Sequence, residues 1–195
     1  MTAQPKPQIT EAEYLERERV SPGKHEYYAG QIFALAGASE AHNLIASNVH
    51  ASLYAQLRGR GCRIYPSDMR IKVLKTGLYT YPDLSIVCGK PEFTHMAKRD
   101  TLINPTLIIE ILSPSTERYD RGVKSQNYRT IEALKEYILI AQDIYHIEQY
   151  TRHEPNKWLL TEAVGLEAAL TLSSIESVLA LADAYELVEL PPIAD

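Results

Sequence analysis

A carboxylate in the middle of an apolar run constrains the fold of this chain more than any other feature. The run Leu107-Ile-Ile-Glu-Ile-Leu112 is rich in β-branched residues and lies between Pro105 and Pro114. Such a run is typical of a central strand that is buried on both faces. A buried carboxylate such as Glu110 is costly unless it is paired, protonated or bound to a metal ion. The chain must therefore bring a partner to Glu110.

The segment after this strand offers a partner. The turn-forming residues 113–116 end the strand, and the pattern that follows predicts a helix from Asp120 to Glu132. Asp120, Lys124 and Tyr128 are spaced by four residues and therefore lie on one face of that helix. A buried acid on a strand and a cation on the next helix can converge on one site.

A second carboxylate, Asp83, follows Pro82 at the start of the strand predicted from Tyr79 to Val87. Two carboxylates on adjacent strands can bind a hard cation such as Mg²⁺, with water and a substrate phosphate in the other positions. The metal polarises the phosphoryl oxygen and lowers the pKa of a bound water. The Lys124 ammonium can orient that water or stabilise the developing charge. Asp83, Glu110 and Lys124 together indicate a metal-dependent phosphodiester hydrolase.

Structural roles are the alternatives for the same residues. Glu110 can form a buried salt bridge with Arg70 or Lys124 without any chemistry. Asp83 can be a turn-forming residue, and Asp120 can simply cap its helix.

The order of elements predicts an α/β fold. We expect one domain over residues 1–195, with 1–9 flexible and a mixed β-sheet flanked by helices. Its core has the order αβββαβ, with an N-terminal hairpin and a C-terminal β extension. The predicted elements are a helix at 11–19 with a capping box at Thr10, a hairpin at 25–35, a helix at 40–58 capped by Ser39, strands at 62–65, 68–74, 79–87 and 107–112, the helix at 120–132, a strand at 136–141, an antiparallel pair at 145–151 and 158–164, and a C-terminal strand with a helix at 181–188.

The net charge of −5 argues against a protein that coats nucleic acid through bulk charge. Two basic segments, 58–75 and 118–129, qualify that statement, and Arg70, Arg118 and Arg121 are candidate contacts to DNA phosphates. An ordinary solvated surface explains these arginines equally well.

The sequence also bears on location. No apolar run approaches the roughly 20 residues that a membrane span needs, and the polar N-terminus does not have the pattern of a signal peptide. Cys62 and Cys88 belong to no CxxC motif or Cys/His cluster. We expect a cytoplasmic protein in which both are reduced, buried thiols.

The chain resembles a known family. Pro82-Asp83, followed by Glu110 in an apolar strand, resembles the PD-(D/E)xK nuclease superfamily, and the wider pattern is similar to the Uma2 family of restriction-endonuclease-like proteins. The matching pieces are Glu26-Tyr-Tyr-Ala-Gly30, His42 at a helix start, Pro82-Asp83-Leu84, Glu110-Ile-Leu-Ser-Pro-Ser-Thr116, Asp120 with Lys124 and Tyr128, and Glu136-Tyr137. The resemblance implies a DNA endonuclease that uses Mg²⁺ or Mn²⁺, with Asp83 and Glu110 as metal ligands. It adds His42 and Glu26 as assisting residues. His42 as a capping or surface residue, and Glu26 as an exposed hairpin residue, are the structural alternatives.

One position departs from the superfamily pattern. The superfamily usually places a lysine two residues after the glutamate, where this chain has Leu112. Lys124 is the candidate replacement, since a lysine has a long, flexible side chain. Other functions that fit are a catalytically inactive binding or assembly module and a hydrolase of small phosphodiesters. For an endonuclease we expect a homodimer, because two sites cut both strands of a duplex most easily.

Overall fold

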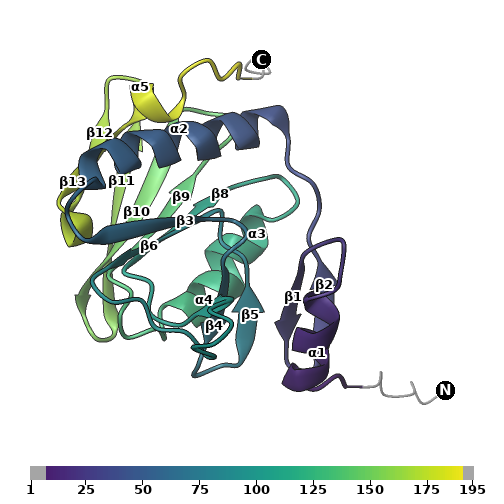
Figure 1. The fold of residues 1–195 in the computed structure, drawn as a ribbon. Coiled ribbons are helices and arrows are strands. Elements are labelled where there is room, and N and C mark those ends of the chain that lie inside the picture. The colour runs from purple at the N-terminus through teal and green to yellow at the C-terminus, as the bar shows by residue number, and fades with distance from the viewer. Residues whose placement is uncertain (1–7, 191–195) are drawn as a thin grey trace.

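The computed structural model describes residues 8–190, and a six-stranded mixed sheet forms its centre (Figure 1). The strand order is β11-β10-β9-β8-β6-β3, in which β8 and β9 are parallel and the other neighbours are antiparallel. Read along the chain, α2, β3, β6, β8, the helical segment 117–128 and β9 have the predicted αβββαβ order. The strands are β3 (Cys62–Pro66), β6 (Leu84–Cys88), β8 (Leu107–Ile111), β9 (Glu136–Ile140), β10 (His146–Glu154) and β11 (Lys157–Val164).

A second sheet has the order β2-β1-β5-β4-β7 and contains the predicted N-terminal hairpin. Its strands are β1 (His25–Tyr28), β2 (Gln31–Ala34), β4 (Arg70–Val73), β5 (Leu78–Thr80) and β7 (Thr101–Leu102). The prediction of a single strand from Tyr79 to Val87 was wrong. The chain leaves this sheet after Thr80 and enters the central sheet at Leu84. Pro82 explains the break, since it cannot donate a ladder hydrogen bond. Asp83 therefore lies where the chain crosses between the two sheets.

The helices that cover the sheets form where local signals predict them. Helix α1 (Glu11–Glu18) begins with the complete capping box of Thr10 and Glu13. Helix α2 (Glu40–Leu57) begins after Ser39, whose hydroxyl accepts from the backbone N–H of His42. The buried row Ile45, Val49, Leu53 and Leu57 packs α2 against the central sheet. No helix within residues 8–190 is long and apolar enough to cross a membrane.

The helical segment after β8 is shifted relative to the prediction. It runs as α3 (Glu117–Tyr119), the π-helix η1 (Asp120–Lys124) and α4 (Ser125–Tyr128), so the predicted range 120–132 starts and ends too late. Arg152 on β10 helps to end it, because its guanidinium donates to the carbonyls of Arg129, Ile131 and Leu134. A single π-helical turn is frequent at functional sites.

The C-terminal part packs on the same face as α2. Strands β12 (Ala169–Leu172) and β13 (Ser177–Ala180) form a two-stranded sheet. The short helix η2 (Ser173–Ile175) connects them, and α5 (Leu181–Ala184) follows β13. The helix predicted at 181–188 is thus shorter. At the other end, the N–H of Ile9 donates to the carbonyl of Gly30, and the carbonyl of Ile9 accepts from the Tyr27 hydroxyl. Residues 1–7 of the segment expected to be flexible lie outside the described residues.

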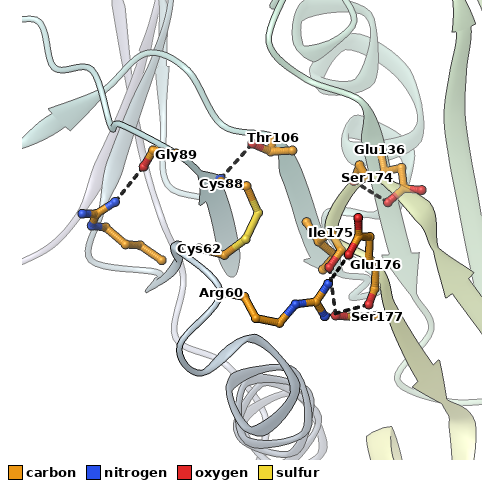
Figure 2. The surroundings of a disulfide bond; sticks show 11 residues. Arg60, Cys62, Cys88, Gly89, Thr106, Glu136, Ser174, Ile175, Glu176 and Ser177 are labelled. Atoms are coloured by element: carbon orange, nitrogen blue, oxygen red, sulfur yellow. Dashed lines mark hydrogen bonds and ion pairs between the residues drawn. A yellow bond between two sulfur atoms is a disulfide. The ribbon is translucent and has the colours of Figure 1, made fainter.

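Cys62 and Cys88 form a disulfide between β3 and β6 (Figure 2). The prediction of reduced, buried thiols was wrong, since both residues are bonded and only half-buried. The register of the two strands explains the pairing, because it sets the cysteines directly opposite each other with Cα atoms 4.0 Å apart. Which strands are neighbours is a long-range property that cysteine spacing does not reveal.

Candidate active site

Glu110 lies on β8, in the middle of the central sheet, and two partners hold its carboxylate. Lys124 Nζ is 2.8 Å from Glu110 Oε1, and the Tyr128 hydroxyl donates to the same oxygen at 2.7 Å. Burial raises the pKa of Glu110 well above its usual range, and the carboxylates of Asp120 and Asp83 add to that effect, while Lys124 opposes it. The helical segment 117–128 thus supplies the partners that the buried acid requires.

Three carboxylates surround the Lys124 ammonium. Besides Glu110, Asp120 Oδ1 lies at 3.3 Å and Glu26 Oε1 at 3.4 Å. Burial alone would lower the pKa of Lys124, but these acids, with Glu110 foremost, raise it well above the usual value. The lysine is therefore held as a cation. Leu112, at the position where the superfamily has its lysine, is buried in the hydrophobic core.

Glu26 reaches the site from the second sheet. It lies on β1, is 3% exposed, and accepts a short hydrogen bond from the Thr80 hydroxyl at the end of β5. The Thr80 oxygen also lies 3.4 Å from the Tyr128 hydroxyl. Because Glu26 and Thr80 belong to one sheet and Glu110 to the other, the site forms where the two sheets meet.

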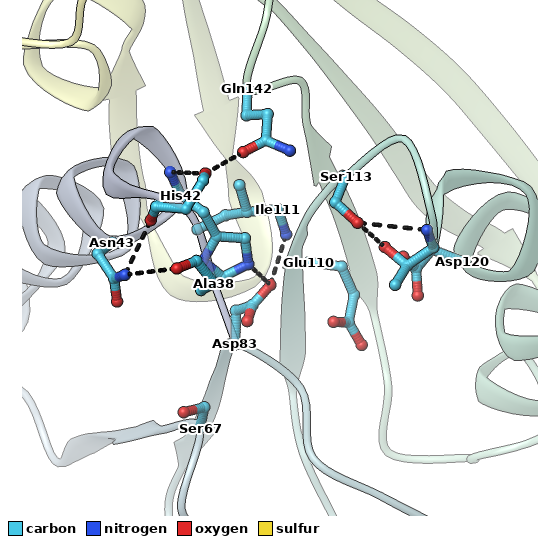
Figure 3. A network of polar contacts seen from close by, with 12 residues as sticks. Ala38, His42, Asn43, Ser67, Asp83, Glu110, Ile111, Ser113, Asp120 and Gln142 are labelled. Carbon is cyan, nitrogen blue, oxygen red and sulfur yellow. Dashed lines mark hydrogen bonds and ion pairs between the residues drawn. The ribbon is translucent and has the colours of Figure 1, made fainter. Parts of the chain in front are cut away.

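Asp83 and His42 form the more exposed side of the site, and Figure 3 shows the contact between their side chains. Asp83 Oδ2 accepts from the backbone N–H of Ile111 at 2.7 Å and lies 3.2 Å from His42 Nε2. Ser39 caps α2 and so places His42 in its first turn. The Asp83 and His42 side chains are each 17% exposed, so this side is more accessible than the ion pairs around Lys124.

The donor set fits a hard divalent cation. Asp83 Oδ1 and Glu110 Oε2 have no hydrogen-bond partner among residues 8–190, since both carboxylates use their other oxygen for protein contacts. Asp83 directly precedes β6, which is the neighbour of β8, because Leu84 on β6 pairs with Ile109 on β8. Carboxylate oxygens are the ligands that Mg²⁺ and Mn²⁺ prefer.

The three arginines proposed as DNA contacts differ in their surroundings. Arg70 was a wrong choice, because it is 3% exposed and donates to Thr101 and Tyr81. Arg121 is paired with Glu117 at 2.9 Å and with Glu148. Arg118 is exposed and keeps its proposed role as a prediction.

Sequence reasoning missed two features. Thr80 carried no signal, because a threonine at a strand end is commonplace. The second feature is a cluster of potential metal ligands, His146, Glu148 and Glu162, whose donor atoms lie within 4.8 Å of one another. His146 and Glu148 alternate along β10, and Glu148 pairs with Glu162 on β11, so a register prediction for this hairpin could have found the cluster.

The chain is similar to known proteins in sequence and in fold. Residues 11–183 match the sequence profile of the Uma2 family, described as "Putative restriction endonuclease". Two uncharacterized proteins of Synechocystis sp. are similar: one is 38% identical, over 85% of this chain and 93% of its own length, and the other is 35% identical, over 80% of each. A crystal structure from Anabaena variabilis, of "a putative nuclease belonging to DUF820", covers 91% of this chain and 97% of its own, with a TM-score of 0.71 and 20% identity. That likeness shows a shared nuclease-type fold.

Proposed function

Because this chain belongs to the Uma2 family of restriction-endonuclease-like proteins, we propose that it is a DNA endonuclease that requires Mg²⁺ or Mn²⁺. One observation carries the proposal: the Lys124 ammonium lies 2.8 Å from Glu110, with Asp83 immediately before the neighbouring strand β6. Metal ligands and a fixed cation at one place are the groups that phosphodiester hydrolysis needs.

Each residue has a definite role in this proposal. Asp83 and Glu110 hold the metal ion, which when bound polarises the phosphoryl oxygen and lowers the pKa of a bound water. His42 and the N–H of Ile111 fix the Asp83 carboxylate, and Tyr128 fixes that of Glu110. Groups that orient metal ligands in this way tune both affinity and activity.

Lys124 acts as a cation and not as a base. Its raised pKa keeps the ammonium protonated at neutral pH, so it cannot accept a proton from water. It can donate hydrogen bonds to the negative charge that develops on the phosphate oxygens. Glu26 and Asp120 hold the ammonium in position for that task.

The proposal also includes a partner and a location. DNA is the substrate, and the protein meets it in the cytoplasm. We include a homodimer in the proposal, since two copies of the site cut both strands of a duplex.

One observation favours a second function, a catalytically inactive binding module. The Lys124 side chain is only 7% exposed and already contacts three carboxylates. A cation so enclosed can serve to hold the two sheets together without touching a substrate.

Nicking of supercoiled plasmid by the purified protein separates these functions. The reaction is run with Mg²⁺, Mn²⁺ or EDTA for the wild type, Glu110→Ala and Lys124→Ala. Glu154→Ala and Lys157→Ala are matched controls, because this surface ion pair lies on the β10–β11 hairpin, away from the site. If the protein is an endonuclease, we expect metal-dependent nicking by the wild type and both control variants, and none by the two site variants. No nicking by the folded wild type on supercoiled, linear and single-stranded DNA would favour the binding module.

A further inference from the structure

A cavity of about 470 Å³ lies between the C-terminal half of α2 and the open edge of β3, away from the catalytic carboxylates. In Figure 1, β3 runs beneath α2, and β3 is the last strand of the central sheet. Two aromatic side chains of α2 line the cavity. The rings of His50 and Tyr54 stack with centroids 6.2 Å apart and planes inclined by 6°, and Tyr54 is 57% exposed. One flat aromatic face is thus presented to solvent.

The cavity is basic although the chain as a whole is acidic. Arg58 and Arg63 line it, and no Asp or Glu is among its lining residues. Both arginines are exposed, and Arg63 is steadied by a hydrogen bond from its guanidinium to the carbonyl of Gly89 at 2.7 Å. In a chain with a net charge of −5, such a recess favours an anionic ligand.

Both α2 and β3 run from this cavity to the candidate active site. His42 lies in the first turn of α2. His50 and Tyr54 follow the buried positions Val49 and Leu53 by one residue, and Arg58 is the C-cap residue of the helix. From His42, which contacts Asp83, to Tyr54 the helix advances about 18 Å. The C-terminal end of β3 lies near the candidate active site, because Pro66 pairs with Leu84, the residue after Asp83.

We propose that the cavity binds an unpaired DNA strand that runs along α2 and β3 from the Asp83/Glu110 site. The inference rests on the proposed function and narrows its substrate to DNA with a single-stranded segment, such as an overhang or a flap. Bases of a duplex are stacked on one another and cannot reach Tyr54, whereas an unpaired base can stack on its ring. Arg58 and Arg63 supply the contacts to the phosphates.

Fluorescence anisotropy in EDTA tests binding without cleavage. The probes are a labelled oligothymidylate of about 15 nucleotides, a length that spans such a site, and a blunt duplex of the same length. We expect the oligothymidylate to bind more tightly than the duplex. Tyr54→Ala should raise the Kd for the oligothymidylate at least about fivefold, and Tyr54→Phe, which keeps the ring, should restore it.

Arg58→Ala tests the phosphate contact separately. It should reduce the slope of log Kd against log salt by about 0.7, the value for one phosphate of a single strand. Arg17→Ala, an exposed arginine on α1 with the same change of charge, should leave the slope unchanged. Circular dichroism verifies that each variant is folded.

Three results would overturn the inference. They are equal binding of the oligothymidylate by wild type and Tyr54→Ala, a preference for the blunt duplex, and complete displacement of the oligothymidylate by an equal concentration of thymidine monophosphate. A different result would contradict the proposed function alone. Tyr54-dependent binding without metal-dependent nicking would exclude the endonuclease and support the strand-binding surface. Metal-dependent nicking that requires Glu110, together with equal binding by wild type and Tyr54→Ala, would support the endonuclease and exclude the strand-binding surface.

Discussion

Breaking the Cys62–Cys88 disulfide should destabilise the folded chain by an amount that follows from the spacing of the cysteines. The bridge closes a loop with a sequence separation of 26. In the chain-entropy description, a cross-link of that length removes unfolded-state entropy equivalent to about 3.5 kcal/mol at 25 °C. For a chain of this size, that free energy corresponds to a Tm lower by about 7–14 °C.

Urea unfolding measures this difference directly. The oxidised wild type is compared with the same protein under reductant and with the variant Cys62→Ser/Cys88→Ser, and intact mass verifies the thiol state. Reduced wild type and double variant should agree, and the variant should not respond to reductant. A difference in unfolding free energy below about 1 kcal/mol between oxidised and reduced wild type would refute the loop-entropy reasoning.

Three further predictions concern single side chains. Burial raises the folded-state pKa of Glu110 above the unfolded value of 4.5. The contribution of the protonated Glu110 side chain to the unfolding free energy is therefore complete below pH 4.5 and is lost as the pH rises through the folded-state pKa. The unfolding free energy of the wild type relative to Glu110→Gln, measured in urea at several pH values, should therefore fall as the pH rises above 4.5; a constant difference contradicts this. Tyr128→Phe removes the hydroxyl that donates to Glu110, so nicking should slow by about tenfold and half-maximal activity should need more Mg²⁺. Rates and Mg²⁺ titrations equal to those of the wild type would exclude a positioning role for Tyr128. Arg152→Ala leaves the carbonyls of Arg129, Ile131 and Leu134 without their donor and should cost about 2–4 kcal/mol in urea unfolding, and Lys157→Ala, the control, should cost less than about 0.5 kcal/mol.

Local signals in the sequence predicted the local structure well. The capping box at Thr10 and the Ser39 cap mark α1 and α2 because hydrogen bonds within four residues determine a helix start. The apolar run around Glu110 predicted a fully buried central strand, and every residue of β8 is buried. The need of a buried acid for a partner then indicated Lys124, which contacts Glu110.

Features set by distant parts of the chain were not predictable in this way. The sequence pattern predicted one strand from Tyr79 to Val87, whereas the chain changes sheets between Thr80 and Leu84. Arg70 looked like a surface cation, yet Thr101, Tyr81 and Asp100 enclose it, and only the packed fold determines such neighbours. The disulfide depends likewise on which strands are adjacent and in which register.

The meeting of two sheets at the candidate site has a consequence during synthesis on the ribosome. Glu26 and Thr80 are made early, on strands of the second sheet, while Glu110 and Lys124 emerge later and must dock against them. A partly made or clipped chain without a docked second sheet lacks Glu26 beside the ammonium. Such a chain would not assemble the full set of charges, and under the proposed function its cutting activity would arise only when folding is complete.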